Sequence, residues 1–198
     1  MLFSLNNLPN LLTIFRVVII PIFIWLLVDP SRLQINLAII IFTIAACTDF
    51  LDGFLARKLR VVSDFGKLLD PLADKILVMS ALVLMINLRS EFNNEPWVPA
   101  WMVVLVLMRE MWVTGIRGIA ATKGIVISAA DTAKWKSALQ MISIIFLLLH
   151  DLPILILNKI VSAKVIGLSL LSASLMLSYI TAFNYTVSFF SRAKLNND

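Results

Sequence analysis

The chain is 198 residues long, which is the length of one domain. Hydrophobic residues make up 60% of it and its mean hydropathy is +0.94, well above the values of soluble proteins. These values exclude an ordinary soluble protein and predict a protein embedded in a membrane. The net charge of +5 does not indicate nucleic-acid binding, because the basic residues flank apolar runs and do not cluster with exposed aromatic residues.

Six apolar runs follow one another along the chain, and each is close to or above the roughly 20 residues that cross a bilayer as a helix. They cover residues 10–28, 34–57, 67–88, 97–120, 136–156 and 160–190. The mildly amphipathic residues 1–10 are expected to lie along the membrane interface as a short helix. The sequence therefore predicts an all-α integral membrane protein, a single domain over residues 1–198 with six transmembrane helices.

The basic residues predict the orientation, since they gather on the cytoplasmic side of membrane proteins. With both termini cytoplasmic, the outer segments hold only Arg32, Arg89, Lys159 and Lys164. The inner segments hold Arg57, Lys58, Arg60, Lys67, Lys75, Arg117, Lys123, Lys134, Lys136, Arg192 and Lys194. We expect the protein to lie in a membrane, surrounded by its lipids, with residues 49–74 at the cytoplasmic side.

The aspartates of residues 49–74 lie between two apolar runs. They are Asp49, Asp52, Asp70 and Asp74. A carboxylate at membrane depth is costly, and it usually marks a functional site. Asp49 and Asp52 share one helical face, as do Asp70 and Asp74, and a short turn near residues 58–65 is expected to place the two helices side by side.

Four carboxylates this close repel one another unless cations neutralise them. Ligands that are all oxygens favour hard cations, Mg²⁺ or Mn²⁺, over zinc. The four aspartates suit two ions of the kind that hold a reacting phosphate between them. The alternative is that the aspartates form buried salt bridges with Arg57, Lys67 and Lys75, which does not account for the small residues nearby.

Small and polar residues accompany the aspartates and are suited to a phosphate ligand. Gly53 and Ala56 leave a smooth helix face, and Arg57 offers a planar fork for phosphate oxygens. Ser63 and Gly66 lie in the predicted turn, where a hydroxyl and bare backbone can meet a ligand. Pro71 leaves the start of the third helix open: either the helix begins near Gly66, or Asp70 caps it and Pro71 is its first residue.

The spacing D-x2-D-G-x2-A-R-x8-G-x3-D-x3-D is met at every position, and it resembles the signature of the CDP-alcohol phosphotransferase family. This resemblance implies a six-helix membrane enzyme, commonly a homodimer, with a polar cavity open to the cytosol. It implies that an acceptor alcohol attacks the β-phosphorus of a CDP-linked lipid and that CMP leaves. The implied metal ligands are Asp49, Asp52, Asp70 and Asp74, and Asp74 is also the implied catalytic base.

The resemblance also implies a binding site for CDP-diacylglycerol. Its implied residues are Gly53, Ala56, Arg57, Ser63 and Gly66. The N-terminal N-x-L-T-x-x-R pattern is similar to the nucleotide-contacting entry of the family, which adds Asn10 and Thr13. Asn10, Thr13 and Arg16 are equally compatible with helix-cap and interface roles, so both readings stay open.

A second polar group lies on residues 97–120 and just before residue 137. Glu110, Thr114 and Arg117 share one helical face, and polar groups inside a span are expected to face the protein interior. The predicted basic pocket comprises Arg109, Arg117, Lys134 and Lys136. Flanking charge explains Lys134 equally well, whereas Arg109 lies within the apolar run.

A basic pocket favours an anionic acceptor, and glycerol 3-phosphate fits. The strings R-E-x-x-V-T-G-I-R and K-W-K-S-A-L-Q-M resemble those of family members that use glycerol 3-phosphate, although these usually carry threonine where this chain has Ser137. Inositol phosphate, serine and phosphatidylglycerol are the alternative acceptors. A membrane prenyltransferase needs more spans, and a cation transporter needs polar groups toward both membrane faces, so both are weaker alternatives.

Overall fold

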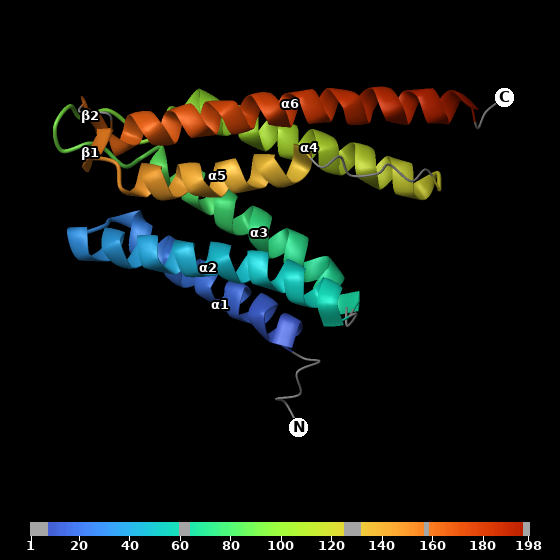
Figure 1. Cartoon of the computed structure of the whole chain (residues 1–198), viewed down its shortest axis with the longest axis horizontal. Helices are drawn as coiled ribbons and strands as arrows, with labels where there is room; N and C mark the ends of the chain where they lie inside the picture. Colours follow the sequence, from blue (N-terminus) through green and yellow to red (C-terminus); the bar gives the residue numbers. More distant parts are fainter. Residues whose placement is uncertain (1–7, 60–63, 125–131, 157–158, 196–198) are drawn as a thin grey trace. The chain divides into compact units, whose positions relative to one another are not determined.

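The computed structural model describes residues 8–59, 64–124, 132–156 and 159–195, and describes no side chains at 8–13, 49–59, 64–71, 132–134, 156 and 193–195. Helices dominate the described chain (Figure 1). They are α1 (Leu8–Val28), α2 (Arg32–Leu59), α3 (Asp64–Met85), α4 (Ala100–Thr122), α5 (Thr132–Leu148) and α6 (Ala163–Leu195). Each of the six predicted apolar runs corresponds to one of these helices.

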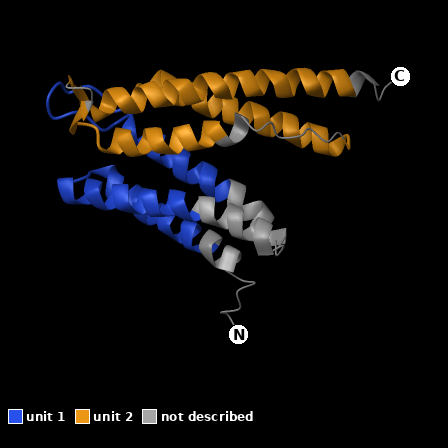
Figure 2. Ribbon diagram, in the orientation of Figure 1, with its two compact units in different colours: residues 1–97 blue, residues 98–198 orange. Residues whose placement is uncertain are grey.

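The chain forms two compact units, residues 1–97 and residues 98–198 (Figure 2). The first contains α1, α2 and α3, and the second contains α4, α5, α6 and a short hairpin. The prediction of a single domain over residues 1–198 stays a prediction.

In the first unit, α1 packs against both α2 and α3. The packing is aromatic and aliphatic: Phe23 and Phe42 are fully buried, with ring centroids 5.7 Å apart, and Leu27 is buried as well. Buried residues recur every three or four positions on α1, so one face of this helix packs inside the unit.

The start of α3, which the sequence left open, is Asp64. Pro71 therefore lies inside the helix, and Asp70 is not its N-cap. A proline there has no N–H to donate to the preceding turn, so α3 lacks one backbone hydrogen bond. Asp70 and Asp74 are still one helical turn apart.

In the second unit, α6 packs along α5 and also contacts α4. The closest approach is at Gly167, where an added Cβ would lie 2.7 Å from the Leu147 side chain and 3.0 Å from its backbone nitrogen. The missing side chain is what lets α5 and α6 come this close.

The predicted fifth span over residues 136–156 is too long, because α5 ends at Leu148. The strands β1 (Pro153–Ile156) and β2 (Lys159–Ser162) form an antiparallel hairpin, with Pro153 opposite Ser162. Pro153 cannot continue a helix, and the isoleucine and valine residues that follow favour strands. This hairpin is the exception to the predicted all-α fold.

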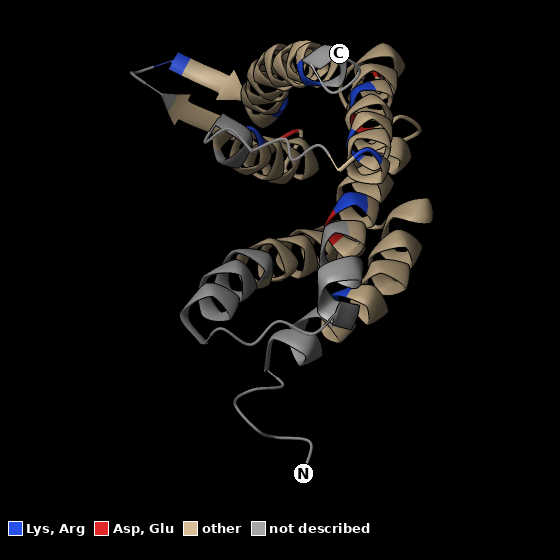
Figure 3. Ribbon diagram, turned by 90° about the vertical axis from the view of Figure 1, so that its right-hand side faces the viewer, with Lys and Arg blue, Asp and Glu red and all other residues tan. Residues whose placement is uncertain are grey.

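The described helices are largely uncharged along much of their length (Figure 3). Among the described residues, Ala163–Arg192 in α6 is long and apolar enough to cross a membrane, with a hydropathy of 1.8. Ile14–Val28, Arg32–Thr48 and Trp135–Leu148 are shorter apolar stretches.

The Gly167 contact yields a prediction about stability. Gly167→Ala should lower the free energy of unfolding by about 1–3 kcal/mol, because the new methyl group meets the backbone of Leu147 as well as its side chain. The measurement is thermal unfolding in detergent. Gly118→Ala is the control, since a Cβ there meets no atom within 4 Å, and it should be neutral or stabilise by up to about 1 kcal/mol. Equal midpoints for the two variants would contradict this packing.

Candidate active site

The predicted metal ligands lie on two consecutive helices of the first unit. Asp49 and Asp52 lie in the last part of α2, and Asp70 and Asp74 lie in the first part of α3. Asp49 and Asp74 are the same number of residues away from the end of α2 and the start of α3, respectively. At a helical rise of 1.5 Å per residue, each lies about 15 Å along its helix from the segment that connects α2 to α3. The two pairs of aspartates thus lie at similar distances along their helices from the segment that connects α2 to α3.

Of these four aspartates, Asp74 has a described side chain. It forms an ion pair with Arg16. The Nη1 of Arg16 on α1 donates to Oδ1 of Asp74 on α3. Arg16 is 1% exposed and the Asp74 side chain is 28% exposed, so a fully buried guanidinium points toward a carboxylate with partial access to solvent. A buried charge requires a partner of this kind.

The residues present fit a divalent cation by the chemistry of their donors. All four predicted ligands are carboxylates, which suit hard cations, and the helix backbone places them in two pairs at matching depths. The side chains of Asp49, Asp52 and Asp70 lie outside the described residues, so the ligand set stays a prediction.

Most of the predicted CDP-diacylglycerol residues also lie outside the described side chains. Ser63 is outside the described residues altogether. The others are located by backbone only, with Asn10 and Thr13 in α1, Gly53, Ala56 and Arg57 in α2, and Gly66 in α3. Their roles stay predictions.

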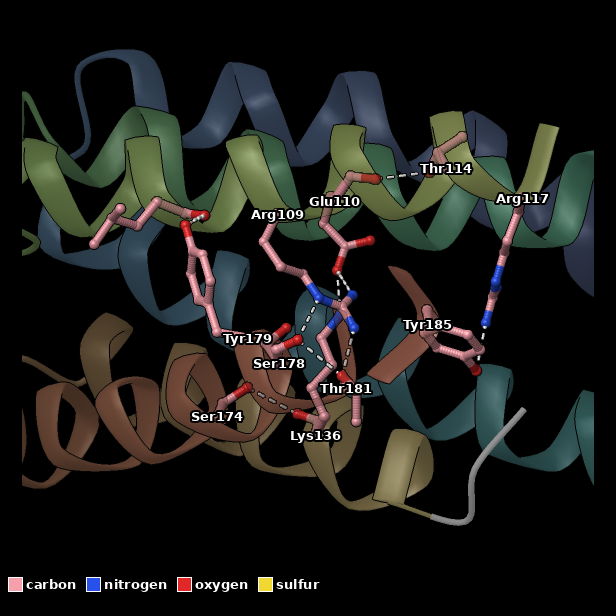
Figure 4. A network of polar contacts seen from close by, with 11 residues as sticks. Arg109, Glu110, Thr114, Arg117, Lys136, Ser174, Ser178, Tyr179, Thr181 and Tyr185 are labelled. Carbon is pink, nitrogen blue, oxygen red and sulfur yellow. Dashed lines mark hydrogen bonds and ion pairs between the residues drawn. The ribbon is translucent and has the colours of Figure 1, made fainter. Parts of the chain in front are cut away.

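A network of polar contacts in the second unit centres on Arg109 of α4 (Figure 4). Its Nε donates to the carbonyl oxygen of Ser178 at 2.9 Å, and its Nη2 donates to Oγ1 of Thr181 at 2.9 Å. Both partners lie on α6, and Arg109 is 6% exposed. Arg109 therefore ties α4 to α6 through donors that are buried and satisfied.

Glu110 links this arginine to the lysine of α5. Its Oε1 accepts from Nη1 of Arg109 at 2.8 Å and also accepts from Nζ of Lys136. Lys136 is buried, and its carbonyl oxygen accepts a hydrogen bond from the Ser174 hydroxyl at 3.0 Å. Two cations from different helices thus share one carboxylate.

Arg117 has a different environment from that of Arg109. Its side chain is exposed, its Nη2 donates to the hydroxyl of Tyr185 at 3.0 Å, and its guanidinium carbon lies 5.0 Å from the centre of the Tyr185 ring. Tyr185 itself is buried on α6. The structure therefore brings Arg109 and Lys136 together at Glu110, and it places Arg117 two turns further along α4, against Tyr185. The side chain of Lys134 is not described.

Sequence comparison identifies the family. The family model for CDP-alcohol phosphatidyltransferase matches residues 6–186. The chain belongs to the CDP-alcohol phosphatidyltransferase family. The resemblance inferred from the aspartate spacing is confirmed, and members of this family are membrane proteins that are generally dependent on divalent metals.

Curated relatives in this family share one name, CDP-diacylglycerol–glycerol-3-phosphate 3-phosphatidyltransferase. The Bacillus subtilis protein is 42% identical over 159 residues, covering 74% of this chain and 79% of the relative. The Rickettsia typhi protein is 33% identical over 181 residues, covering 91% of this chain and 96% of the relative. The Pseudomonas fluorescens protein is 38% identical over 148 residues, covering 72% of each.

The sequence-based predictions did not include the α6 residues of this polar network. Ser174, Ser178, Thr181 and Tyr185 recur at spacings of four, three and four, so they lie on one face of α6. All four are buried. A polar stripe at helical spacing inside a long apolar run was the signal that would have identified them.

The ion pair of Asp74 yields a prediction that does not depend on metal. With a chelator present, Asp74→Asn should lower the free energy of unfolding by about 1–3 kcal/mol, because the buried guanidinium of Arg16 loses its ion pair with the Asp74 carboxylate. Asp29→Asn is the matched control, since Asp29 is exposed, and it should change stability by less than about 0.5 kcal/mol. Thermal unfolding in detergent measures both. An unchanged unfolding midpoint for Asp74→Asn would contradict a stabilising role for this ion pair.

Proposed function

We propose that this protein transfers a phosphatidyl group from CDP-diacylglycerol to glycerol 3-phosphate, which yields phosphatidylglycerophosphate and CMP. The observation that carries the proposal is the match to relatives of that name, at 33–42% identity and over up to 91% of this chain. The basic residues of α4 and α5 that take part in these polar contacts support an acceptor that is itself anionic.

In this proposal, residues of α1, α2 and α3 bind the donor and the metal ions. Asp49, Asp52, Asp70 and Asp74 hold two divalent cations, Mg²⁺ or Mn²⁺. When bound, such cations neutralise the diphosphate and stabilise charge on the departing CMP. The CDP-diacylglycerol is bound by Asn10, Thr13, Gly53, Ala56, Arg57, Ser63 and Gly66.

In the reaction, the hydroxyl of glycerol 3-phosphate forms a new bond to the β-phosphorus, and the bond from that phosphorus to the CMP oxygen breaks. Asp74 accepts the hydroxyl proton as general base. Arg16 supports this role, because its ion pair with Oδ1 holds the carboxylate on the α1-facing side of α3. A carboxylate held in one place is better aligned for proton transfer than a freely rotating one.

In this proposal, residues of α4 and α5 bind the acceptor. Arg117 and Lys136 bind the phosphate of glycerol 3-phosphate, with Lys134 contributing charge at the start of α5. Arg109 completes the cationic site from its buried position, where three of its nitrogen atoms already contact Ser178, Glu110 and Thr181. Arg109 therefore acts mainly by fixing the carboxylate that holds Lys136.

The membrane arrangement is also part of the proposal. Six transmembrane helices span a bacterial inner membrane with both termini in the cytoplasm, and the site opens to the cytoplasmic side, where a charged acceptor is available. The diacylglycerol chains of the donor lie against membrane lipid. The enzyme works as a homodimer.

A substrate panel with purified protein tests the reaction. CMP release from CDP-diacylglycerol should require both glycerol 3-phosphate and a divalent cation, and a chelator should reduce it to background because the diphosphate loses its counter-charges. The panel replaces glycerol 3-phosphate in turn with serine, inositol phosphate and phosphatidylglycerol. CMP release with one of these compounds and not with glycerol 3-phosphate would contradict the proposed acceptor. The proposed transfer of a phosphatidyl group from CDP-diacylglycerol would still hold.

Lys136→Met tests the acceptor site. It should raise the KM for glycerol 3-phosphate by about tenfold or more, as expected for the loss of one charged contact to phosphate, and leave the KM for CDP-diacylglycerol within about twofold. Lys123→Met is the matched control, because Lys123 is an exposed lysine at the end of α4, and both KM values should stay close to wild type. Equal effects on both substrates would place Lys136 outside the acceptor site.

A further inference from the structure

Arg117 and Tyr185 form a contact to which the proposed reaction does not yet assign a role. Arg117 lies on α4 with its side chain exposed, and Tyr185 lies on α6 (Figure 4). The hydroxyl of Tyr185 accepts a hydrogen bond from Nη2 at 3.0 Å, and the guanidinium carbon lies 5.0 Å from the ring centre. An exposed arginine would otherwise sample many rotamers, so these two contacts are what restrict it.

Tyr185 is itself held firmly. It is 5% exposed and packs with Val113 of α4 and Ala182 of α6 in a buried apolar cluster. Val113 lies one turn before Arg117, so the tyrosine covers two successive turns of α4. Because the Tyr185 ring is fixed by packing, it can hold the Arg117 guanidinium in one position. A solvent-exposed side chain in its place would move together with the arginine.

The remaining donors of Arg117 distinguish it from Arg109. A guanidinium has five N–H groups. Among the described residues, Arg109 donates to Ser178, Glu110 and Thr181, while Arg117 donates to Tyr185. Most N–H groups of the Arg117 guanidinium therefore remain for an external anion. A planar guanidinium binds a phosphate group with two parallel hydrogen bonds.

We propose that Tyr185 is a positioning residue for the acceptor, which holds the guanidinium of Arg117 in the plane and place where it binds the phosphate of glycerol 3-phosphate. This inference rests on the proposed function and adds a residue to it. Tyr185 acts through Arg117 and does not touch the reacting atoms. The residues proposed to bind the donor diphosphate are different ones, so the effect is expected in the KM for the acceptor.

Two substitutions of Tyr185 separate its hydroxyl from its ring. Tyr185→Phe should raise the KM for glycerol 3-phosphate about fivefold, as expected for one lost hydrogen bond, because the ring remains under the guanidinium. Tyr185→Leu should raise it more than tenfold, since the cation–π contact is lost as well. Both should leave the KM for CDP-diacylglycerol within about twofold.

The chain supplies a matched control in its other tyrosine. Tyr179 also lies on α6, and its hydroxyl donates to the carbonyl oxygen of Leu105 on α4 at 3.1 Å. Tyr179→Phe therefore removes a hydroxyl contact between the same two helices without touching Arg117, and both KM values should stay within about twofold of wild type. Thermal unfolding of each variant in detergent shows whether it is folded, and Tyr185→Phe preserves the buried ring.

A double-mutant cycle shows whether Tyr185 acts through Arg117. Arg117→Met should raise the KM for glycerol 3-phosphate, and adding Tyr185→Phe to it should cause no further change. A further change would mean that Tyr185 contacts the acceptor itself, which overturns a positioning role. A rise for Arg117→Met with wild-type values for both Tyr185 variants would overturn the inference alone. An unchanged KM for Arg117→Met, or no reaction with glycerol 3-phosphate in the wild type, would instead overturn the proposed acceptor site or the proposed function.

Discussion

A charged group removed from water needs a counter-charge inside the protein, and this constraint organises both compact units. In the first, the buried guanidinium of Arg16 pairs with Asp74, so α1 and α3 are joined where a catalytic carboxylate is predicted. In the second, Glu110 sits between Arg109 and Lys136, and three helices meet around it. The apolar packing brings these helices together, but the charged pairs determine which residues face one another.

The two arginines of α4 differ in their surroundings and in the role that these surroundings allow. Arg109 is buried, and its donors are used on α6. Arg117, two turns further along, is exposed and rests on one tyrosine. The first therefore contributes rigidity and the second keeps donors for an anion. Basic residues can thus stabilise the packing of helices or bind an anionic ligand. Their hydrogen-bond partners indicate which of the two roles each residue has.

Much of the fold could be predicted from hydropathy alone. Six apolar runs predicted six helices, because a helix is the economical way to satisfy backbone groups in an apolar setting. The prediction was wrong at the end of α5, since run length does not distinguish a continued helix from a strand that follows a turn. Pro153 and the β-branched residues after it carried that information, and they formed β1 and β2.

The sequence by itself determined the family and the chemistry, because eight residues at fixed spacing specify a site through the periodicity of the helix. It also predicted basic residues suited to an anionic acceptor. Only the tertiary structure decided which cation meets which partner: that Arg16 takes Asp74, that Glu110 joins Arg109 to Lys136, and that Tyr185 lies beneath Arg117. The contacts Arg16–Asp74, Glu110–Lys136 and Arg117–Tyr185 join residues 26 to 68 positions apart, and helical periodicity gives the face of a residue but not the neighbour that the face will meet.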